Sequence, residues 1–361
     1  MNYRTLIGLL YIALITQMSY AQTYEETKTY TRSFKTNATT LVDISNKYGM
    51  VIISTWDKDS VQVKATMKIS ERNESRFNKI KDNINIEFSF IQNQINAHTV
   101  FGNKYSGLIK DVAEATNYLS SNNEGSRINY RIYVPEYINL TIDNKYGDVI
   151  LPVLKGNVKV TLSNGNIQAR DIDGQSDFNL AFGNAKIDKL RQANISLNFV
   201  QTDIESAGSL TINGRSSEIN IGTVETLRLD TRRDRIYIKK VNSLFGESYF
   251  SKLNLGTVIN ECKMQLSYGD LSMINMSRNF TNLELKSQAC DLNIQLSEPK
   301  PYKAKIQAKN TYLNLPSDLK STVSDYKAKI ETQPVEFIYS QPTNLKLKIN
   351  ITGADLKISH Q

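Results

Sequence analysis

A short glycine-containing step recurs at a fixed interval along this chain, and it constrains the fold more than any other feature of the sequence. The step reads "YGDVIL" at 146–151, "NGNIQA" at 164–169 and "FGNAKI" at 182–187, a spacing of 18 residues each time. Gly147, Gly165 and Gly183 occupy the same position in the three copies. Self-similarity at a short fixed period is typical of repeat architectures, in which each repeat stacks on its neighbours.

An apolar column continues the repeat along the chain, with steps of between 15 and 21 residues. Its members in chain order are Val149, Ile167, Ala185, Ile204, Ile219, Ile236, Leu253, Leu271, Leu292 and Leu313. Nearly every member has another apolar residue two positions further on. A period of two predicts a strand with one buried face.

A second pattern predicts another strand in every coil. Val160 and Leu162 match Phe178 and Leu180 at a step of 18, then Leu197 and Phe199 at a step of 19, and later coils keep one member in Ile212, Leu229, Met264 and Leu285. Strands that pair only with neighbouring coils predict an all-β fold, a parallel β-solenoid with coils of about 18 residues. Right-handed winding is the default for parallel crossovers. Glycine in the turn would supply a positive φ or a close backbone approach.

The tetrapeptide Asn-Lys-Tyr-Gly occurs at 46–49 and again at 144–147, and it predicts the domain organisation. In the first copy Val51 corresponds to Val149, and Val61 and Val63 are expected to form the second strand of that coil. The expected divisions are a signal peptide at 1–21, a first coil with N-terminal strands at 22–70, an inserted excursion at 71–127, and a solenoid with irregular C-terminal coils at 128–361.

The excursion between the two tetrapeptides is predicted to contain a helix and a hairpin. Residues 71–82 read as a short polar helix, 83–100 alternate like a hairpin, and 107–119 carry apolar residues at helical spacing. Such an insertion would cap the open end of the solenoid, whose first coil otherwise exposes an unpaired strand edge.

The first 21 residues have the features of a secretory signal. Arg4 precedes an apolar stretch from Leu6 to Ile15, and Ser19-Tyr20-Ala21 ends in small residues. We therefore expect an exported protein, in the periplasm, at the outer-membrane periphery or at the cell surface. No later run approaches the roughly 20 apolar residues of a transmembrane helix. The net charge of +8 favours anionic partners, although an exported chain is not expected to meet nucleic acid.

The chain resembles an exported adhesin-like family of unknown function, of the type common in Bacteroidetes and related to the auto-transporter adhesin head (GIN) domain. The resemblance rests on "YRIYVPEYINLTIDNKYGDV", on the "LSNGNI" and "FGNAKI" steps that follow, and on the signal peptide. It covers roughly residues 40–360 and implies a β-solenoid fold, an envelope location and a role in adhesion. The family supplies no catalytic residues.

The sequence offers little material for catalysis. Its two histidines, His98 and His360, have no Cys, His or carboxylate at a metal-ligand spacing. The polar column beside the turns alternates in charge without a convincing acid and base pair. We therefore expect neither a cofactor nor a metal, and no enzymatic activity. Cys262 is expected to point inward in the column of Leu227 and Leu244, while Cys290 falls in the glycine column, which makes a buried thiol and a turn cysteine more probable than a disulfide.

One outward-facing stripe is a candidate ligand surface. The position between each pair of core residues is occupied by Asn220, Tyr237, Asn254, Ser272, Asn293 and Asn314. Amides and an exposed aromatic ring suit carbohydrate surfaces, although ladders of Asn also stack for structural reasons. Nearby, Arg232, Arg233 and Arg235 form a candidate anion contact.

Three functional hypotheses follow. The first is a non-enzymatic envelope scaffold that binds a polysaccharide or a partner protein. The second is a polysaccharide lyase or hydrolase, which rests on analogy with other β-helices alone. The third is a periplasmic accessory of envelope-stress signalling. The sequence does not predict the oligomeric state.

Overall fold

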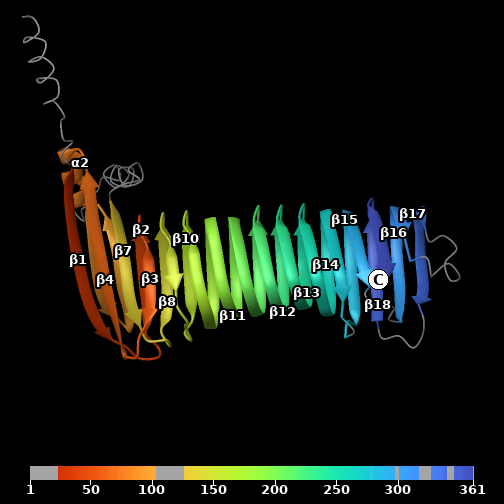
Figure 1. Ribbon diagram of the computed structural model, residues 1–361, viewed down its shortest axis with the longest axis horizontal. Coiled ribbons are helices and arrows are strands. Elements are labelled where there is room, and N and C mark those ends of the chain that lie inside the picture. Colours follow the sequence, from red (N-terminus) through yellow and green to blue (C-terminus); the bar gives the residue numbers. More distant parts are fainter. Residues whose placement is uncertain are drawn as a thin grey trace, which may run out of the picture.

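The computed structural model describes residues 23–102, 126–277, 279–296, 301–316, 327–339 and 345–360. These residues are almost entirely strand, so the predicted all-β class is confirmed. The described part of the chain forms an elongated body in which one sheet of 19 strands runs from end to end (Figure 1).

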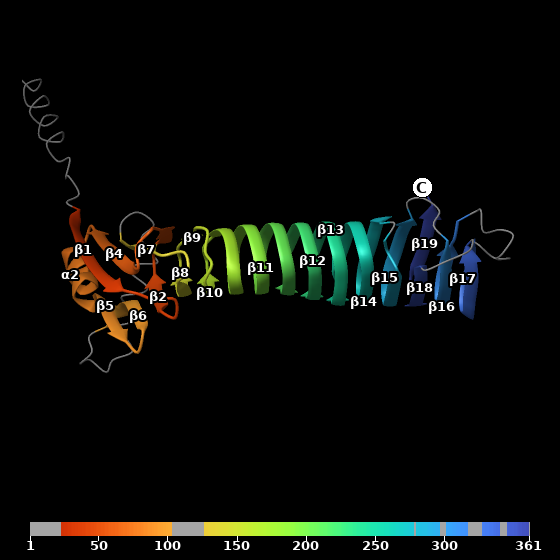
Figure 2. The same cartoon turned by 90° about the horizontal axis from the view of Figure 1, so that it is seen from below.

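The middle of the body is a chain that winds in successive coils (Figure 2). The winding strands are β2 (Leu41–Lys47), β3 (Val51–Thr55), β8 (Asn139–Lys145), β9 (Val149–Leu151), β10 (Val158–Ser163), β11 (Ile167–Arg215), β12 (Glu218–Arg232), β13 (Arg235–Tyr249), β14 (Lys252–Met276) and β15 (Asn282–Leu296). Each pairs in parallel with the strand of the next coil. Val158 pairs with Ser176 at a step of 18 and Glu218 with Arg235 at a step of 17.

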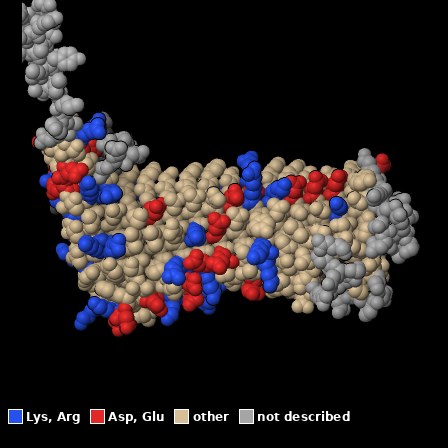
Figure 3. Space-filling view, in the orientation of Figure 1, with Lys and Arg blue, Asp and Glu red and all other residues tan. Residues whose placement is uncertain are grey.

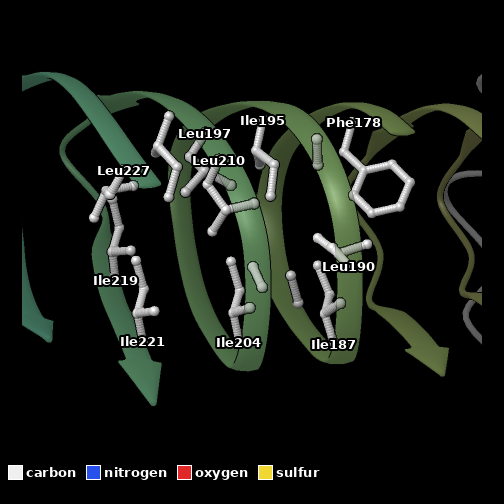
Figure 4. Close-up of a cluster of buried hydrophobic side chains, with 14 of the residues drawn as sticks. Phe178, Ile187, Leu190, Ile195, Leu197, Ile204, Leu210, Ile219, Ile221 and Leu227 are labelled. Carbon is white, nitrogen blue, oxygen red and sulfur yellow. The ribbon is translucent and has the colours of Figure 1, made fainter. Parts of the chain in front are cut away.

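The core is a continuous row of side chains enclosed by the coils (Figure 4). Residues such as Ile195 and Leu197 point from one side of a coil toward Ile187 and Leu190 on the other (Figure 4), and all four are buried. Alternation along each strand sends every second side chain inward, which explains the period of two in the sequence. The columns of aliphatic residues are therefore the lining of this core.

The two copies of Asn-Lys-Tyr-Gly are stacked steps of neighbouring coils. Asn46 pairs with Asn144 in the parallel ladder of β2 and β8, and the rings of Tyr48 and Tyr146 stack with centroids 5.1 Å apart. The Asn144 side chain donates across its own turn to the Gly147 carbonyl at 2.8 Å. The predicted equivalence of the two copies is confirmed by this register.

The glycine of each step is required by a close approach of two backbones. A Cβ at Gly147 would overlap the carbonyl oxygen of Gly49, and one at Gly165 would overlap that of Gly147. The positive φ of the turn belongs instead to the residue before the glycine, with φ of 57° at Tyr146 and 56° at Asn164. Of the two explanations predicted for the glycine column, the close approach is the correct one at these positions.

The predicted alignment is wrong by two residues at the fourth member of the apolar column. Thr202, not Ile204, pairs with Ile219, while Ile204 pairs with Ile221. Phe199 was assigned to the core but is exposed and stacks on Phe182. The error arose because the buried inward position is a threonine here, so the apolar column shifted to the next aliphatic residue. The step is therefore one residue shorter than the usual 18, not one longer.

The N-terminal end is covered by antiparallel strands and one helix, seen in Figure 2. These are β1 (Tyr24–Lys35), β4 (Ser60–Glu71), α2 (Glu74–Asn83), β5 (Ile84–Ile91), β6 (Gln94–Phe101) and β7 (Arg127–Val134). β6 continues the parallel ladder beside β2, and β5 folds back on it. Asn73 caps α2 by accepting from the Arg76 amide at 3.0 Å. The second helix predicted at 107–119 lies outside the described residues.

The prediction that Val61 and Val63 form a second coil strand is wrong. Both are buried, but they lie in β4, which pairs antiparallel with β1 on one side and β7 on the other. A buried alternating strand reads the same in the sequence whether its neighbours are parallel or antiparallel. The coil strand expected there is instead supplied by β2.

The C-terminal end departs from chain order. β18 (Leu345–Thr352) and β19 (Asp355–His360) lie between β15 and β16 (Tyr302–Asn314), pairing in parallel with both. β17 (Lys327–Tyr339) then pairs antiparallel with β16. The apolar column accordingly runs from Leu292 through Leu356 to Leu313.

The steric role of the glycine column predicts the effect of a single methyl group. Gly165→Ala is expected to lower the free energy of unfolding by roughly 2–3 kcal/mol, because the stacked coils must separate to admit the Cβ. Gly353→Ala is the control, since a Cβ there meets nothing within 4 Å and only a φ of 69° is strained, at a cost of about 1 kcal/mol. Urea unfolding followed by circular dichroism compares the two. An equal or smaller loss at Gly165 would contradict the close-approach explanation.

Candidate binding surface

The N-terminal half of the predicted amide stripe is continuous. Asn220, Tyr237 and Asn254 are register partners on β12, β13 and β14, and the Tyr237 side chain is 48% exposed. Asn220 and Tyr237 lie in a shallow depression of about 260 Å³. The Asn220 amide already donates to Asp203 Oδ1 at 3.0 Å, so of these two residues the tyrosine offers the freer contact.

The C-terminal half of the stripe is interrupted. Asn293 pairs with Lys357 of the inserted β19, and Lys357 pairs in turn with Asn314. Asn254, Asn293 and Asn314 share a second depression of about 530 Å³ with Lys357. The structure thus divides the predicted stripe into two separate hollows, and the second contains a lysine that the sequence did not place there.

The predicted arginines project from one corner of the winding. Arg232 is the register partner of Arg215, and Arg235 lies between Glu218 and Lys252. All three predicted arginines are exposed. Arg233 occupies the corner itself, with φ of 61°. The three residues are therefore close together, as the sequence suggested, but they face different sides of a corner.

A buried aspartate holds this corner in place. Asp234 Oδ1 accepts from the Ser217 amide at 2.6 Å and Oδ2 from the Arg232 amide at 3.0 Å. The Asp234 amide itself donates to Ser251 Oγ at 3.0 Å. Burial raises the pKa of Asp234 to about 6, although the two amide hydrogen bonds oppose the shift. Ser217, Asp234 and Ser251 thus occupy the position that glycine has in other coils, and their hydrogen bonds link three successive coils.

A row of residues that includes five exposed aromatic rings follows the same corner along the body, and sequence analysis missed it. We call this row the corner ridge. Its residues, each preceding the glycine column, are Tyr48, Tyr146, Asn164, Phe182, Phe199, Ser216, Arg233, Phe250, Tyr268, Ala289 and Asn310, and all have a positive φ. Phe182 stacks on Phe199 at 5.4 Å, and Phe250 on Tyr268 at 4.9 Å. These four rings are between 46% and 55% exposed.

The backbone conformation makes the rings noteworthy. A left-handed conformation costs an ordinary residue roughly 1–2 kcal/mol, and Asn or Gly would occupy the corner more easily. Asn164 and Ser216 show that a small polar side chain fits the same position. Strain at exposed positions is a recognised mark of function. The signal was present in the sequence, since Tyr146 and Phe182 precede aligned glycines, but the misplaced Phe199 concealed it.

The N-terminal end of the corner ridge borders a larger hollow. This hollow of about 870 Å³ is lined by the stacked rings of Tyr48 and Tyr146 and by the cations Lys64, Arg127 and Arg131. Lys47 lies over the Tyr48 ring, with Nζ 4.9 Å from its centroid. Burial, and secondarily Lys145, lowers the pKa of Lys47. Aromatic rings and cations therefore occur together at the N-terminal end of the corner ridge, as they do around Arg233.

The described residues provide no metal centre. No group of three His, Cys, Asp or Glu within the described ranges could hold an ion. His98 Nε2 lies 3.6 Å from Asp43 Oδ1, and His360 Nε2 lies 3.0 Å from the Tyr302 hydroxyl. Both histidine side chains therefore contact neighbouring side chains of the fold.

Both cysteines are free and buried. Cys262 pairs with Leu244 and Cys290 with Gly269, which are the predicted columns. Burial raises the pKa of each thiol to about 12, so neither is an activated nucleophile.

Charge on the remaining surface is mixed. Figure 3 shows Lys and Arg interspersed with Asp and Glu on the face that it presents. Within the described ranges, no helix is both long and apolar enough to cross a membrane.

Comparison with known proteins gives distant structural similarities only. No family model and no curated protein matches the chain. It is similar to the structure of a candidate lipid-binding protein from Parabacteroides distasonis (9% identity, 92% of this chain and 97% of the other, TM-score 0.32). It is also similar to a candidate adhesin from Bacteroides fragilis (8%, 92% and 97%, TM-score 0.27) and a candidate cell adhesion protein from Clostridium sporogenes (10%, 93% and 100%, TM-score 0.21). Similarity at this level does not establish a function.

The raised pKa of Asp234 predicts a pH-dependent stability. The native carboxyl holds its proton up to about pH 6, whereas the unfolded one loses it near pH 3.9. The native state therefore binds more protons in this window, and its stability falls as pH rises. Relative to Asp234→Asn, the wild-type free energy of unfolding is expected to drop by about 1–2 kcal/mol between pH 4 and pH 6.5. Chemical unfolding at several pH values measures the difference in unfolding free energy between the two proteins. A difference that does not change with pH would contradict the raised pKa of Asp234.

The strained corner rings predict little cost for their removal. Phe199→Asn and Phe250→Asn are each expected to change the free energy of unfolding by less than about 1 kcal/mol. Relief of the left-handed strain offsets a lost ring stack worth about 0.5–1.5 kcal/mol. Thermal unfolding tests this, with Phe178→Asn in the core as the strongly destabilised reference. A loss above about 2 kcal/mol at the ridge would show that its rings serve mainly stability.

Proposed function

We propose that this chain is an exported, non-enzymatic scaffold of the cell envelope or surface that binds a polysaccharide through repeated outward side chains. The winding is, in this proposal, the right-handed parallel β-solenoid that the repeat predicts. Residues 1–21 are its signal peptide, and residues 71–127 include its N-terminal cap. The polysaccharide contact is the amide stripe centred on Tyr237.

One observation carries the binding proposal. An exposed ring, Tyr237, stands between Asn220 and Asn254 on three register-paired strands, at the spacing of about 4.8 Å that parallel strands impose. The strands beneath are fixed by a buried core on their other face. A flat ring with amides on both sides, held on a rigid support, is suited to a sugar ring and its hydroxyls.

The non-enzymatic reading is supported by the lack of a reacting group in this region. The residues that share the depression with Tyr237 include Lys186, Asp188, Asp203 and Glu205. Among these, Asp203 accepts from Asn220, and Asp188 lies 3.9 Å from Arg170. Both carboxylates are therefore engaged with neighbouring side chains instead of being arranged as the acid and base pair that glycoside cleavage uses.

Tyr237→Ala tests the proposal. Loss of the ring is expected to weaken binding of the mature chain to its polysaccharide by about tenfold, the usual size of an aromatic anchor. A glycan array of neutral and acidic polymers provides the measurement. Phe90→Ala, an equally exposed ring on the β5–β6 hairpin, is the matched control and should leave binding unchanged. No binding to any glycan, or equal effects of the two variants, would count against the proposal.

A further inference from the structure

The middle of the corner ridge places cations between two pairs of exposed rings. Between Phe199 and Phe250 the ridge carries only Ser216 and Arg233. Around this gap lie five exposed cations, which together we call the arginine notch: Arg215, Arg232, Arg233, Arg235 and Lys252. The notch contains all three arginines that the sequence suggested as an anion contact.

Like charges lie side by side in the notch. Arg215 is directly opposite Arg232, and Arg235 is directly opposite Lys252. Such pairs destabilise a sheet, and within the described part of the chain none of the five cations has a carboxylate at ion-pair distance. Glu218 is the acid beside Arg235. Asp230 and Glu247 lie two positions before Arg232 and Tyr249 on their strands. The notch therefore retains an excess of positive charge that a bound anion would neutralise.

The dimensions of the gap suit an elongated ligand. Phe199 and Phe250 are three coils apart, which corresponds to about 14 Å at the parallel-strand spacing. Each ring has one face covered by its stacking partner, because the planes of Phe182 and Phe199 differ by only 8° and those of Phe250 and Tyr268 by 9°. The other faces of Phe199 and Phe250 look along the ridge into the gap.

The same combination occurs a second time on the ridge. At its N-terminal end the Tyr48–Tyr146 stack borders a hollow that also contains Lys64, Arg127 and Arg131. Lys64 and Arg131 are directly opposite each other in the antiparallel ladder of β4 and β7. Stacked rings beside cations thus recur along one line of the surface, here with one acid, Asp148, in the same hollow.

We infer that the corner ridge binds an acidic polysaccharide that runs along the body, with its carboxylate or sulfate groups in the arginine notch and its sugar rings against Phe199 and Phe250. Arginine forms paired hydrogen bonds to either kind of anion. The inference deepens the proposed function, on which it rests, by naming the class of polysaccharide. It also adds a second contact, on a different surface from that of Tyr237.

Single-stranded nucleic acid is the competing polyanion, and the ring geometry disfavours it. Proteins that bind single strands offer an open aromatic face to successive bases. Here the rings are stacked on one another in pairs, so few faces remain open. The two open faces, of Phe199 and Phe250, lie on either side of the cations, an arrangement that a chain of sugars with regularly spaced acidic groups can follow.

Affinity electrophoresis of the purified chain tests the inference. The probes are polygalacturonate for carboxylates, heparin for sulfates, dextran for a neutral polymer and oligo(dT) for nucleic acid. Arg232→Gln/Arg233→Gln is expected to weaken binding to the acidic polysaccharide at least about tenfold, the worth of one charged hydrogen bond. Phe199→Asn/Phe250→Asn should weaken it by a similar factor. Raised salt should weaken the wild type and have less effect on the arginine variant.

Two controls separate a local effect from a general one. Lys159→Gln/Lys303→Gln removes two exposed cations away from the notch and from the depression of Tyr237, and it should leave binding unchanged. Because Asn164 occupies the same corner position with the same φ, the Phe→Asn variants are expected to remain folded. Circular dichroism verifies that they do.

The outcomes distinguish this inference from the proposed function. Binding to polygalacturonate, heparin or both that both notch variants abolish and the controls preserve supports the inference, and the preferred probe identifies the anion. Binding lost with the arginines but unchanged without the two phenylalanines would overturn it. So would equal or tighter binding of oligo(dT). Binding to dextran that depends on Tyr237 alone would overturn it while leaving the proposed function intact, and no binding to any glycan would contradict both.

Discussion

Backbone hydrogen bonding between successive coils is the constraint on which the rest of this structure depends. Because each coil must pair with the next in parallel, equivalent positions are stacked directly over one another, at 17 or 18 residues per step through most of the body. The corner must then repeat in every coil, with a left-handed residue followed either by a glycine at a close backbone approach or by a residue such as Asp234, whose side chain bonds to the corner. Every outward side chain consequently belongs to a row of equivalent side chains on successive coils, and these rows determine the chemistry of the surface.

The rows differ in whether their polar and charged groups are satisfied by other members of the same row. Asp148, Asn166 and Asn184 form a ladder in which each amide donates to the preceding coil at 2.8–3.1 Å, so this row is complete without a ligand. The rows of Arg215 with Arg232 and of Arg235 with Lys252 place like charges together. Buried polar groups such as Asp234 belong to the first kind, because they fix the corner from within. Rows of the second kind are the ones that a binding partner would complete.

The spacing of apolar residues predicted the all-β class, the coil step and most inward columns. It did so because a strand with one buried face alternates apolar and polar residues along the sequence. It failed where the inward residue is polar, as at Thr202, and where an alternating strand belongs to an antiparallel ladder, as at Val61. It also failed for β18 and β19, since a column of leucines does not record the order in which strands enter a stack. The amide stripe and the arginines lie at outward positions of the coils, whereas the aromatic ridge required the corrected register to become visible.

The position of β18 and β19 has a consequence for how the molecule is built. A coiled chain can usually grow one coil at a time, each new coil finding its template already in place. Among the described strands, β16 pairs with β17, β18 and β19 and not with β15, so it joins the rest of the sheet through residues 345–360, which follow it in the chain. The C-terminal end of the sheet is therefore completed by residues 345–360, which lie between β15 and β16, two strands that precede them in the chain. Coils can stack from the N-terminal side as far as β15, and the sheet beyond that point needs β18 and β19 before β16 can join it.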